Sequence, residues 1–322
     1  MRVPGVKTVR RVAGRLTAGV RGGGLILGYH RVAASSWDPF GLGVDPERFA
    51  QQMEVLARHT RPLALEELLD VRRRRAARRR AVALTFDDGY AECLTEVAPI
   101  LERHGVPATI FAISRAPGHE PWWERLARLL SPSRELPAPP EIEIEGRRFA
   151  VGDGDGVAAR VELARAIHRD LAPRLPDRRK RLLDRLAEAL GVPRDAPPEH
   201  RTLTAEELRR LAVAEQVTVG AHGHSHVPLA GLPAAERRRE IHSCKHALEE
   251  ILGADVIGFS YPHGSVDGSA RDEVRQAGYA YACCSRSGVV HSSNDVFRLP
   301  RVWAPDTDGD RFHRWLRGWI GR

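Results

Sequence analysis

An apolar run in the first third of the chain stops abruptly at two adjacent carboxylates. Leu84, Thr85 and Phe86 are followed directly by Asp87 and Asp88, and then by a glycine. Side chains alternate along a strand and diverge in the turn that follows it, so neighbouring aspartates can face different partners. One of them can bind a cation while the other stays free as a base. A hydrolytic metal site requires this division of roles.

Two histidines with metal-ligand spacing follow a second apolar run, residues 217–219. His222 and His226 are four residues apart, which places both imidazoles on one side of a helical segment at a separation suited to one cation. Together with Asp88 they would supply three protein ligands and leave positions open for water and substrate. Three-ligand sites of this kind are catalytic, whereas closed four-ligand sites are structural. The sequence therefore predicts a catalytic site for a divalent metal.

A second histidine pair has the same spacing but a different setting. His242 and His246 lie in a helical pattern whose apolar face is formed by Ile241, Cys244 and Leu248, so both histidines fall on its polar flank. Ligands on a parallel barrel come from the carboxyl ends of strands, not from the middle of a helix. We expect no metal at this pair.

The elements that must position these residues alternate between strand and helix. Strands are predicted at residues 25–29, 81–86, 108–113, 217–219, 256–260, 279–283 and around 298–303. Helical patterns separate them, and the candidate site residues follow directly after strands. This order predicts an α/β fold, a distorted (β/α) barrel of about seven parallel strands.

The alternation breaks between about residues 115 and 200, where a small hairpin and Arg-rich helical patterns lie between proline-rich stretches. We interpret this part as a mainly helical insertion. The predicted organisation is a basic N-terminal segment at 1–24 and a catalytic domain at 25–322 that carries the insertion at about 115–200.

The N-terminal segment has two interpretations. Residues 6–21 carry small apolar residues at helical spacing with basic residues around them, a pattern that fits a helix packed on its own domain or one lying on an anionic membrane surface. No window approaches 20 consecutive apolar residues, and no apolar secretory signal begins the chain. The four cysteines show no CxxC spacing, which indicates reduced thiols. We expect a cytoplasmic protein, with peripheral membrane contact left open.

The charge balance does not indicate a nucleic-acid partner. The formal net charge is +8, but lysine occurs only at Lys7, Lys180 and Lys245. Such one-sided use of arginine is more typical of coding bias than of a phosphate-binding surface, which ordinarily uses both residues. The sequence gives no indication of the oligomeric state.

The paired motifs resemble those of the polysaccharide deacetylases, carbohydrate esterase family 4. The family's Thr-Phe-Asp-Asp-Gly motif stands at residues 85–89, and its His-x-x-x-His motif stands at 222–226. The resemblance implies that Asp87 is the general base and that the backbone N–H of Tyr90 is an oxyanion donor. It also implies that Asp88, His222 and His226 bind a divalent metal, usually zinc.

The late part of the chain departs from the commonest pattern of the family. The usual Leu-x-His and Arg-x-Pro-aromatic motifs are absent, and the layout is similar to the permuted poly-N-acetylglucosamine deacetylases. That similarity makes His30, at the end of the first strand, the candidate general acid; a histidine bonded to backbone is the alternative. It also makes Tyr261, Pro262 and His263 a substrate-binding loop, in which His263 replaces an aromatic residue.

Two further residues are candidates for substrate contact. Arg301 could orient Asp87, bind substrate or lie on the surface. Trp123, next to Trp122 at the head of a predicted helix, could stack on a pyranose ring or belong to the core of the insertion.

These observations support one main hypothesis and leave two others open. The main one is a metal-dependent hydrolase that removes N-acetyl groups from an amino-sugar-containing saccharide and releases acetate. A hydrolase of the same fold could instead act on an O-acetyl ester or a non-sugar amide. The chain could also be a non-catalytic, basic glycan- or membrane-binding protein, although such a protein has no need of the free Asp87 beside the metal.

Overall fold

The computed structural model describes residues 24–71, 80–133, 141–144, 147–150, 156–193 and 200–320. The predicted N-terminal segment, including the candidate membrane-contacting residues 6–21, lies outside the described residues except for Gly24. In the described part of the chain, no helix combines the length and the apolar character needed to cross a membrane. The four cysteines are buried and unpaired.

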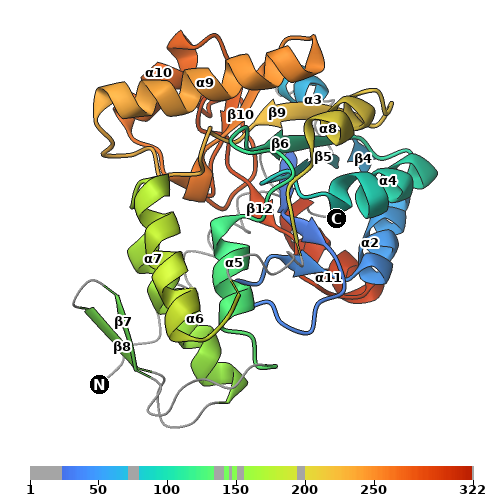
Figure 1. Ribbon diagram of the computed structural model, residues 1–322. Helices are drawn as coiled ribbons and strands as arrows, with labels where there is room; N and C mark the ends of the chain where they lie inside the picture. Colours follow the sequence, from blue (N-terminus) through green and yellow to red (C-terminus); the bar gives the residue numbers. More distant parts are fainter. Residues whose placement is uncertain are drawn as a thin grey trace, which may run out of the picture.

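Seven parallel strands, curled into a half-barrel, form the centre of the molecule (Figure 1). Their order across the sheet is β11 (Tyr281–Cys283), β10 (Gly258–Ser260), β9 (Val217–Ala221), β6 (Ala108–Ala112), β5 (Ala81–Phe86), β1 (Leu25–Tyr29) and β12 (Val302–Trp303). The short β4 (Arg61–Pro62) pairs with the start of β5. The prediction of a distorted barrel of about seven parallel strands is confirmed.

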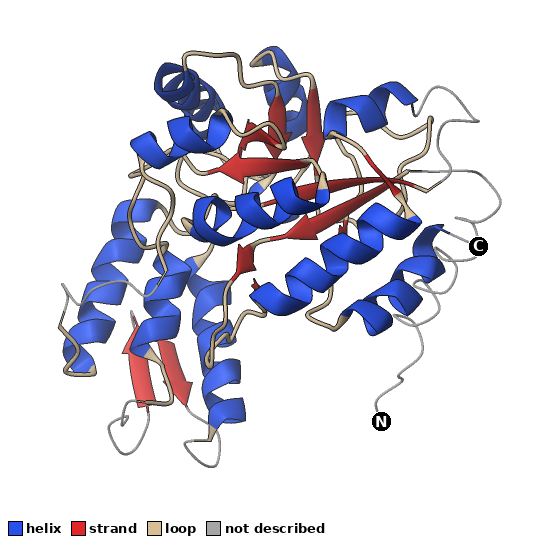
Figure 2. Ribbon diagram, turned by 90° about the vertical axis from the view of Figure 1, so that its right-hand side faces the viewer, coloured by secondary structure: helices blue, strands red, loops and turns tan. Residues whose placement is uncertain are grey.

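The helices of the main body lie around the outside of this sheet, as the strands and helices of Figure 2 show. They are α2 (Pro46–His59), α3 (Leu65–Val71), α4 (Ala98–His104), α8 (Ala205–Ala212), α9 (Ala234–Leu252), α10 (Gly268–Gln276) and α11 (Gly309–Ile320). A short parallel pair, β2 (Arg31–Val32) and β3 (Gly43–Val44), follows β1. Apolar side chains of sheet and helices meet in one large cluster that includes Leu27, Phe49, Leu84, Ile110 and Phe259.

Local sequence signals explain where several helices begin and end. The Asp45 carboxylate accepts hydrogen bonds from two N–H groups in the first turn of α2, and proline occupies the first helical position. Thr204 and Glu207 form a reciprocal capping box at the start of α8. Gly105 ends α4 with φ of 61°, a left-handed conformation that glycine adopts without a steric penalty.

The segment that was predicted as an insertion packs around its own apolar cluster. It contains α5 (Trp122–Leu129), the antiparallel hairpin β7 (Glu141–Ile144) and β8 (Arg147–Ala150), α6 (Val157–Leu171) and α7 (Pro176–Ala189). Side chains shared among the three helices include Leu126, Leu163, Ile167 and Leu186. These elements form the lower left part of the molecule in Figure 1. The predicted Arg-rich helical patterns include two separate helices, α6 and α7, and Pro176 occupies the first position of the second.

The last strand segment connects the two edges of the sheet. Leu299 pairs with Cys283 of β11, and four residues later Trp303 pairs with Gly28 of β1. Arg301 lies between these two pairings and is therefore enclosed, with 1% of its surface exposed. The surface alternative for Arg301 is excluded.

Close packing between neighbouring strands constrains one glycine of β9, two residues before His222. A Cβ atom on Gly220 of β9 would lie 2.5 Å from the Phe111 ring and 3.2 Å from the Gly258 carbonyl oxygen. Gly268, at the start of α10, has open space at the same position.

We therefore expect Gly220→Ala to lower the free energy of unfolding by about 1–3 kcal/mol, as over-packed cores do. Gly268→Ala, the matched control, should leave it unchanged or slightly higher, because alanine favours the helix. Urea denaturation of both variants measures the difference. Equal stability of the two variants would contradict the packing argument.

Candidate metal centre and active site

Three side chains from two strand ends converge on one point. Asp88 Oδ1 lies 3.5 Å from His222 Nε2 and 3.4 Å from His226 Nε2. The three ligand atoms all lie within 4.8 Å of one another, and all three residues are buried. Asp88 follows β5 and the histidines follow β9, so the parallel sheet brings them to the same edge.

His222 is fixed in the protonation state that a ligand needs. Its Nδ1 lies 2.8 Å from the Ser260 carbonyl oxygen at the end of β10. A carbonyl oxygen only accepts, so Nδ1 donates and Nε2 keeps its lone pair facing Asp88. Burial lowers the pKa of His222 and, more strongly, that of His226. Both shifts favour the neutral imidazole, which is the form that binds a metal.

His226 adopts a backbone conformation that is unfavourable for a residue with a side chain. Its φ is 56°. Two buried side chains, one from α7 and one from α9, make hydrogen bonds to the loop that carries it. The buried Arg179 of α7 donates to the carbonyl oxygens of Ser225 and His226, at 2.8 and 3.2 Å. The buried Glu240 of α9 accepts from the Ser225 N–H at 2.7 Å and from its hydroxyl.

The backbone of Asp88 is likewise strained, and one of its side-chain oxygens has no hydrogen-bond partner among the described residues. Its φ is 71°, that of the following Gly89 is 67°, and Asp88 Oδ1 is buried without a hydrogen-bond donor. Burial and the neighbouring charges of Asp87 and Glu124 raise the pKa of Asp88 well above its ordinary value. A buried carboxylate of this kind is costly unless a positive charge is supplied.

These features fit a divalent metal. The orphaned oxygen of Asp88 and the two inward-facing imidazole nitrogens form a mixed N and O donor set, and such sets suit zinc and other first-row cations. The structure brings together the three candidate ligands of the sequence, Asp88, His222 and His226, and these residues would hold the ion.

Asp87 faces a different partner, also as predicted. Burial alone would raise its pKa, but Arg301 donates to both carboxylate oxygens at 2.7 Å and holds the pKa below its ordinary range. Ser260 Oγ lies 3.3 Å from Asp87 and accepts from Arg301 at 2.9 Å. Arg301 therefore positions Asp87 and keeps it ionised.

Tyr90 follows the two aspartates by two residues, and it pairs with a distant segment of the chain. Tyr90 and Thr202 form an antiparallel bridge whose hydrogen bonds are made by the residues on either side, at 2.8 and 2.9 Å. The N–H of Tyr90 itself therefore faces away from that pairing. Its side chain is fully buried, and its hydroxyl donates to Glu124 of α5 at 2.6 Å.

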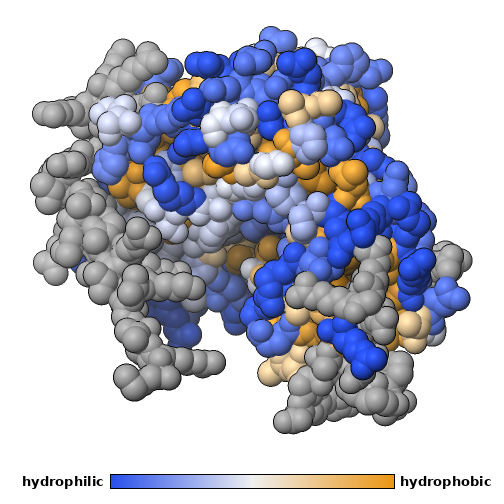
Figure 3. Space-filling view, turned by 90° about the vertical axis from the view of Figure 1, so that its left-hand side faces the viewer, coloured by the Kyte–Doolittle hydropathy of each residue, from blue (hydrophilic) through white to orange (hydrophobic). Residues whose placement is uncertain are grey.

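A cavity of about 360 Å³ opens over the metal centre. It is lined by Asp87, Asp88, His222 and His226 together with His30, and its other walls include Phe40, Leu42, Arg165, His168 and Trp303. In the space-filling view, the molecule is hollowed near the middle of one face, with hydrophilic residues around the hollow (Figure 3).

His30 follows β1 and is partly exposed in this cavity. Its ring stacks on Trp303 with centroids 4.4 Å apart. Burial lowers the pKa of His30 to about 4, so the free protein holds it neutral at pH 7. A catalytic acid in this position must gain its proton during turnover.

Of the predicted substrate-binding loop, His263 lines the cavity, but Tyr261 and Pro262 do not. His263 and Gly264 line the cavity, and the His263 ring lies 4.4 Å from that of His226. Tyr261 is fully buried and donates to the Phe297 carbonyl oxygen at 3.0 Å, so it lies behind the cavity wall. Pro262 is buried against Gly223 and does not line the cavity either.

Trp123 belongs to α5 of the predicted insertion, is 3% exposed and packs against residues of the site. Its ring lies 4.4 Å from that of His226, and its Nε1 donates to the Tyr90 hydroxyl at 2.8 Å. Its edge reaches the cavity, and sugar stacking on it stays a prediction. Trp122 stacks on His168.

The second histidine pair is absent from the site, as expected. His242 Nε2 lies 2.9 Å from Glu273 of α10, and His246 is exposed on α9. His224, between the two ligands, bonds to Ser114 and not to the cluster.

Sequence reasoning missed the walls that the insertion and the last strand contribute. His168 and Arg165 reach the cavity from α6, in an Arg-rich stretch with no distinctive motif. Trp303 ends β12, and its place at the end of the strand predicted around 298–303 was the one available signal.

Comparisons with known proteins agree with this geometry. A family profile described as polysaccharide deacetylase matches residues 74–135 and 187–282. YxkH of Bacillus subtilis, whose name assigns it provisionally to the polysaccharide deacetylases, is 42% identical over 41 residues, which is 13% of this chain and 15% of that protein. The chain thus aligns with less than a sixth of that relative's length.

Solved structures share the fold. IcaB from Ammonifex degensii has a TM-score of 0.60 and 18% identity, and the alignment covers 93% of this chain and 97% of that one. The Streptococcus pyogenes deacetylase PplD, in complex with acetate, has a TM-score of 0.58 and 15% identity, with 90% and 96% covered. At these identities the likeness concerns the fold alone.

The two adjacent aspartates should respond in opposite ways to the same substitution. Asp88→Asn replaces a buried carboxyl group whose Oδ1 has no hydrogen-bond donor by a neutral amide of the same size, so the metal-free protein should keep its unfolding temperature or gain, while added zinc should no longer raise it. Asp87→Asn leaves Arg301 unpaired and should cost about 3–5 kcal/mol of unfolding free energy, while zinc still stabilises the protein.

Thermal unfolding of both variants with chelator and with zinc tests this difference. The division of roles would be refuted by equal loss of zinc stabilisation in the two variants.

Proposed function

Because the chain belongs to the polysaccharide deacetylase family, we propose that it is a metal-dependent hydrolase that removes N-acetyl groups from an amino-sugar-containing saccharide and releases acetate. One observation carries the proposal. The orphaned Asp88 oxygen and two imidazole nitrogens share a cavity with a second carboxylate, Asp87, that is held ionised outside the cluster.

A divalent cation, zinc in this proposal, would supply Lewis-acid chemistry here: it polarises an acetyl carbonyl and lowers the pKa of water. Asp88, His222 and His226 would hold it. His222 is oriented for this role by Ser260, and the strained His226 by the bonds of its loop.

Asp87 acts as the general base in our proposal. Its carboxylate accepts the proton of the attacking water, and the bidentate contact with Arg301 directs it and keeps it ionised at neutral pH. The water oxygen bonds to the acetyl carbon, and the carbonyl oxygen gains negative charge. The N–H of Tyr90, which is free of the pairing with Thr202, donates to that oxygen.

The carbon–nitrogen bond then breaks, and the amine leaves with a proton. His30 is the proposed donor because it is partly exposed in the cavity and Trp303 holds its ring. His30 is neutral before the reaction, so the proton that Asp87 takes from water must pass to His30 before His30 can give it to the leaving amine. An ester's alkoxide needs less help than an amine, so a positioned acid favours an amide substrate.

We expect acetate release from N-acetylated saccharides, abolished by chelator and restored by zinc. A panel of mono- and oligosaccharides carrying N-acetyl or O-acetyl groups measures activity, metal dependence and bond preference together. Acetate release from the O-acetyl compounds alone would contradict the proposal and indicate an esterase. Absence of release from every member with zinc present would favour a binding protein.

The acid assignment makes a separate prediction. His30→Ala should reduce kcat/KM for an acetamide by about 10²–10⁴-fold, the range of general acid catalysis, and affect an aryl acetate far less, because a phenolate leaves without a proton. Steady-state kinetics on both substrates give the comparison. Equal slowing of the two substrates would remove His30 from this role.

A further inference from the structure

The two metal ligands with strained backbones are both held by residues of the insertion. Asp88 and His226 have φ values of 71° and 56°, and neither is a glycine. A left-handed conformation costs such a residue of order 1–3 kcal/mol and persists only where the surrounding structure enforces it. The contacts that enforce it identify residues on which the site depends.

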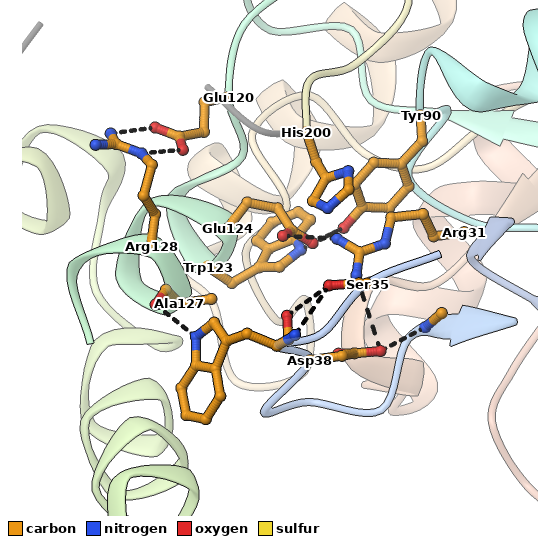
Figure 4. A network of polar contacts seen from close by, with 12 residues as sticks. Arg31, Ser35, Asp38, Tyr90, Glu120, Trp123, Glu124, Ala127, Arg128 and His200 are labelled. Carbon is orange, nitrogen blue, oxygen red and sulfur yellow. Dashed lines mark hydrogen bonds and ion pairs between the residues drawn. The ribbon is translucent and has the colours of Figure 1, made fainter. Parts of the chain in front are cut away.

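The first of these contacts runs from the Asp88 loop to α5. Tyr90 stands two residues after Asp88, and its hydroxyl donates to Glu124 Oε1 at 2.6 Å while it accepts from Trp123 Nε1 at 2.8 Å. Glu124 Oε2 accepts from Arg31 Nη1 at 2.9 Å. Figure 4 shows that these side chains point toward one another in the space between α5 and the loop after β5. Both oxygens of Glu124 are therefore in use, and Tyr90 has one fixed position.

Burial makes this network stiff. Tyr90, Arg31 and Glu124 are 0%, 1% and 7% exposed, and the Arg31 guanidinium lies 5.9 Å from the centre of the Tyr90 ring. In such surroundings a lost partner leaves a polar group without water to replace it. The Tyr90 side chain thus fixes the backbone that carries both Asp88 and the Tyr90 N–H.

The second contact runs from the His226 loop to α7. Arg179 is 1% exposed, and its two terminal nitrogens donate to the carbonyl oxygens of Ser225 and His226. Its guanidinium also lies 5.0 Å from the centre of the Trp122 ring at the head of α5. The carbonyl of a metal ligand is thereby bonded directly to an insertion helix.

From these contacts we infer that the insertion is a working part of the metal centre, in which Glu124, through Tyr90, and Arg179 are positioning residues that hold Asp88 and His226 in their strained ligand conformations. The inference rests on the proposed function only for the role of the Tyr90 N–H. The effect on metal binding stands without it.

The structure offers matched controls inside the insertion. Arg128 of α5 makes a buried two-bond ion pair with Glu120, at 2.8 Å for each bond, on the same helix as Glu124 (Figure 4). Arg160 of α6 is 3% exposed and donates to the Ser131 carbonyl oxygen at 2.8 Å, as Arg179 does to the ligand loop. Neither contact reaches a ligand loop.

The test compares Tyr90→Phe and Arg179→Met with the controls Arg128→Gln and Arg160→Met. Zinc affinity, measured by competition with a chelator, should fall at least tenfold in the first two and stay within twofold of the wild type in the controls. All four variants should lower the unfolding temperature, so stability alone does not separate them. Arg179→Lys, which keeps the charge but loses the second donor arm, should fall between Arg179→Met and the wild type.

Kinetics separate this inference from the proposed function. In Tyr90→Phe, kcat at saturating zinc should drop at least tenfold with KM within twofold, because the oxyanion donor acts in the transition state. If the wild type releases no acetate, the proposed function fails and the zinc affinities still decide the positioning role. Unchanged zinc affinity in both test variants, or an equal loss in the controls, would overturn the inference.

Discussion

The electrostatic cost of one buried carboxyl group, that of Asp88, determines how the site is arranged. Asp88 is buried beside two imidazoles, and its Oδ1 receives no hydrogen bond from any residue that the structure describes. The adjacent Asp87 is equally buried but is fully compensated by Arg301. In our proposal, a cation at Asp88 offsets this difference, and Asp87 remains available for proton transfer. The different surroundings of two neighbouring residues thus create two chemical roles.

The fold supplies this arrangement through the geometry of parallel strands. The carboxyl ends of β1, β5, β9 and β10 lie at one edge of the curled sheet, so residues separated by up to about 230 positions meet there. The segment from Leu299 to Trp303 pairs with β11 at one end and with β1 at the other, so Arg301 between these pairings lies in the interior. Strained loops then turn Asp88 and His226 toward each other, and the insertion stabilises those loops in our inference.

Much of this could be predicted from the sequence because the signals are local. The apolar runs around Leu27, Leu84 and Val219 mark strands by their composition, and polar residues directly after them mark the strand ends. The same logic separated His222 and His226 from the helical pair His242 and His246. The caps formed by Asp45 and Thr204 are local signals of the same kind, because a cap is satisfied within the first turn of its own helix.

The remainder could not be predicted, because it depends on contacts between distant segments. Nothing near Glu124 indicates that its partners are Arg31 and Tyr90, and Arg179 is one of many arginines in a helix with an ordinary pattern. Tyr261 illustrates the opposite case: its motif suggested substrate contact, but tertiary packing turns its hydroxyl toward Phe297. Side-chain direction at strand ends is set by neighbours that the local sequence does not reveal.

X-ray absorption at the zinc edge, measured on protein loaded with one equivalent of zinc, tests the central claim most directly. The account predicts a four- or five-coordinate ion with two imidazole nitrogens at about 2.0 Å, carboxylate or water oxygens as the other ligands and no sulfur. An ion with sulfur ligands, or with fewer than two imidazoles, would contradict it.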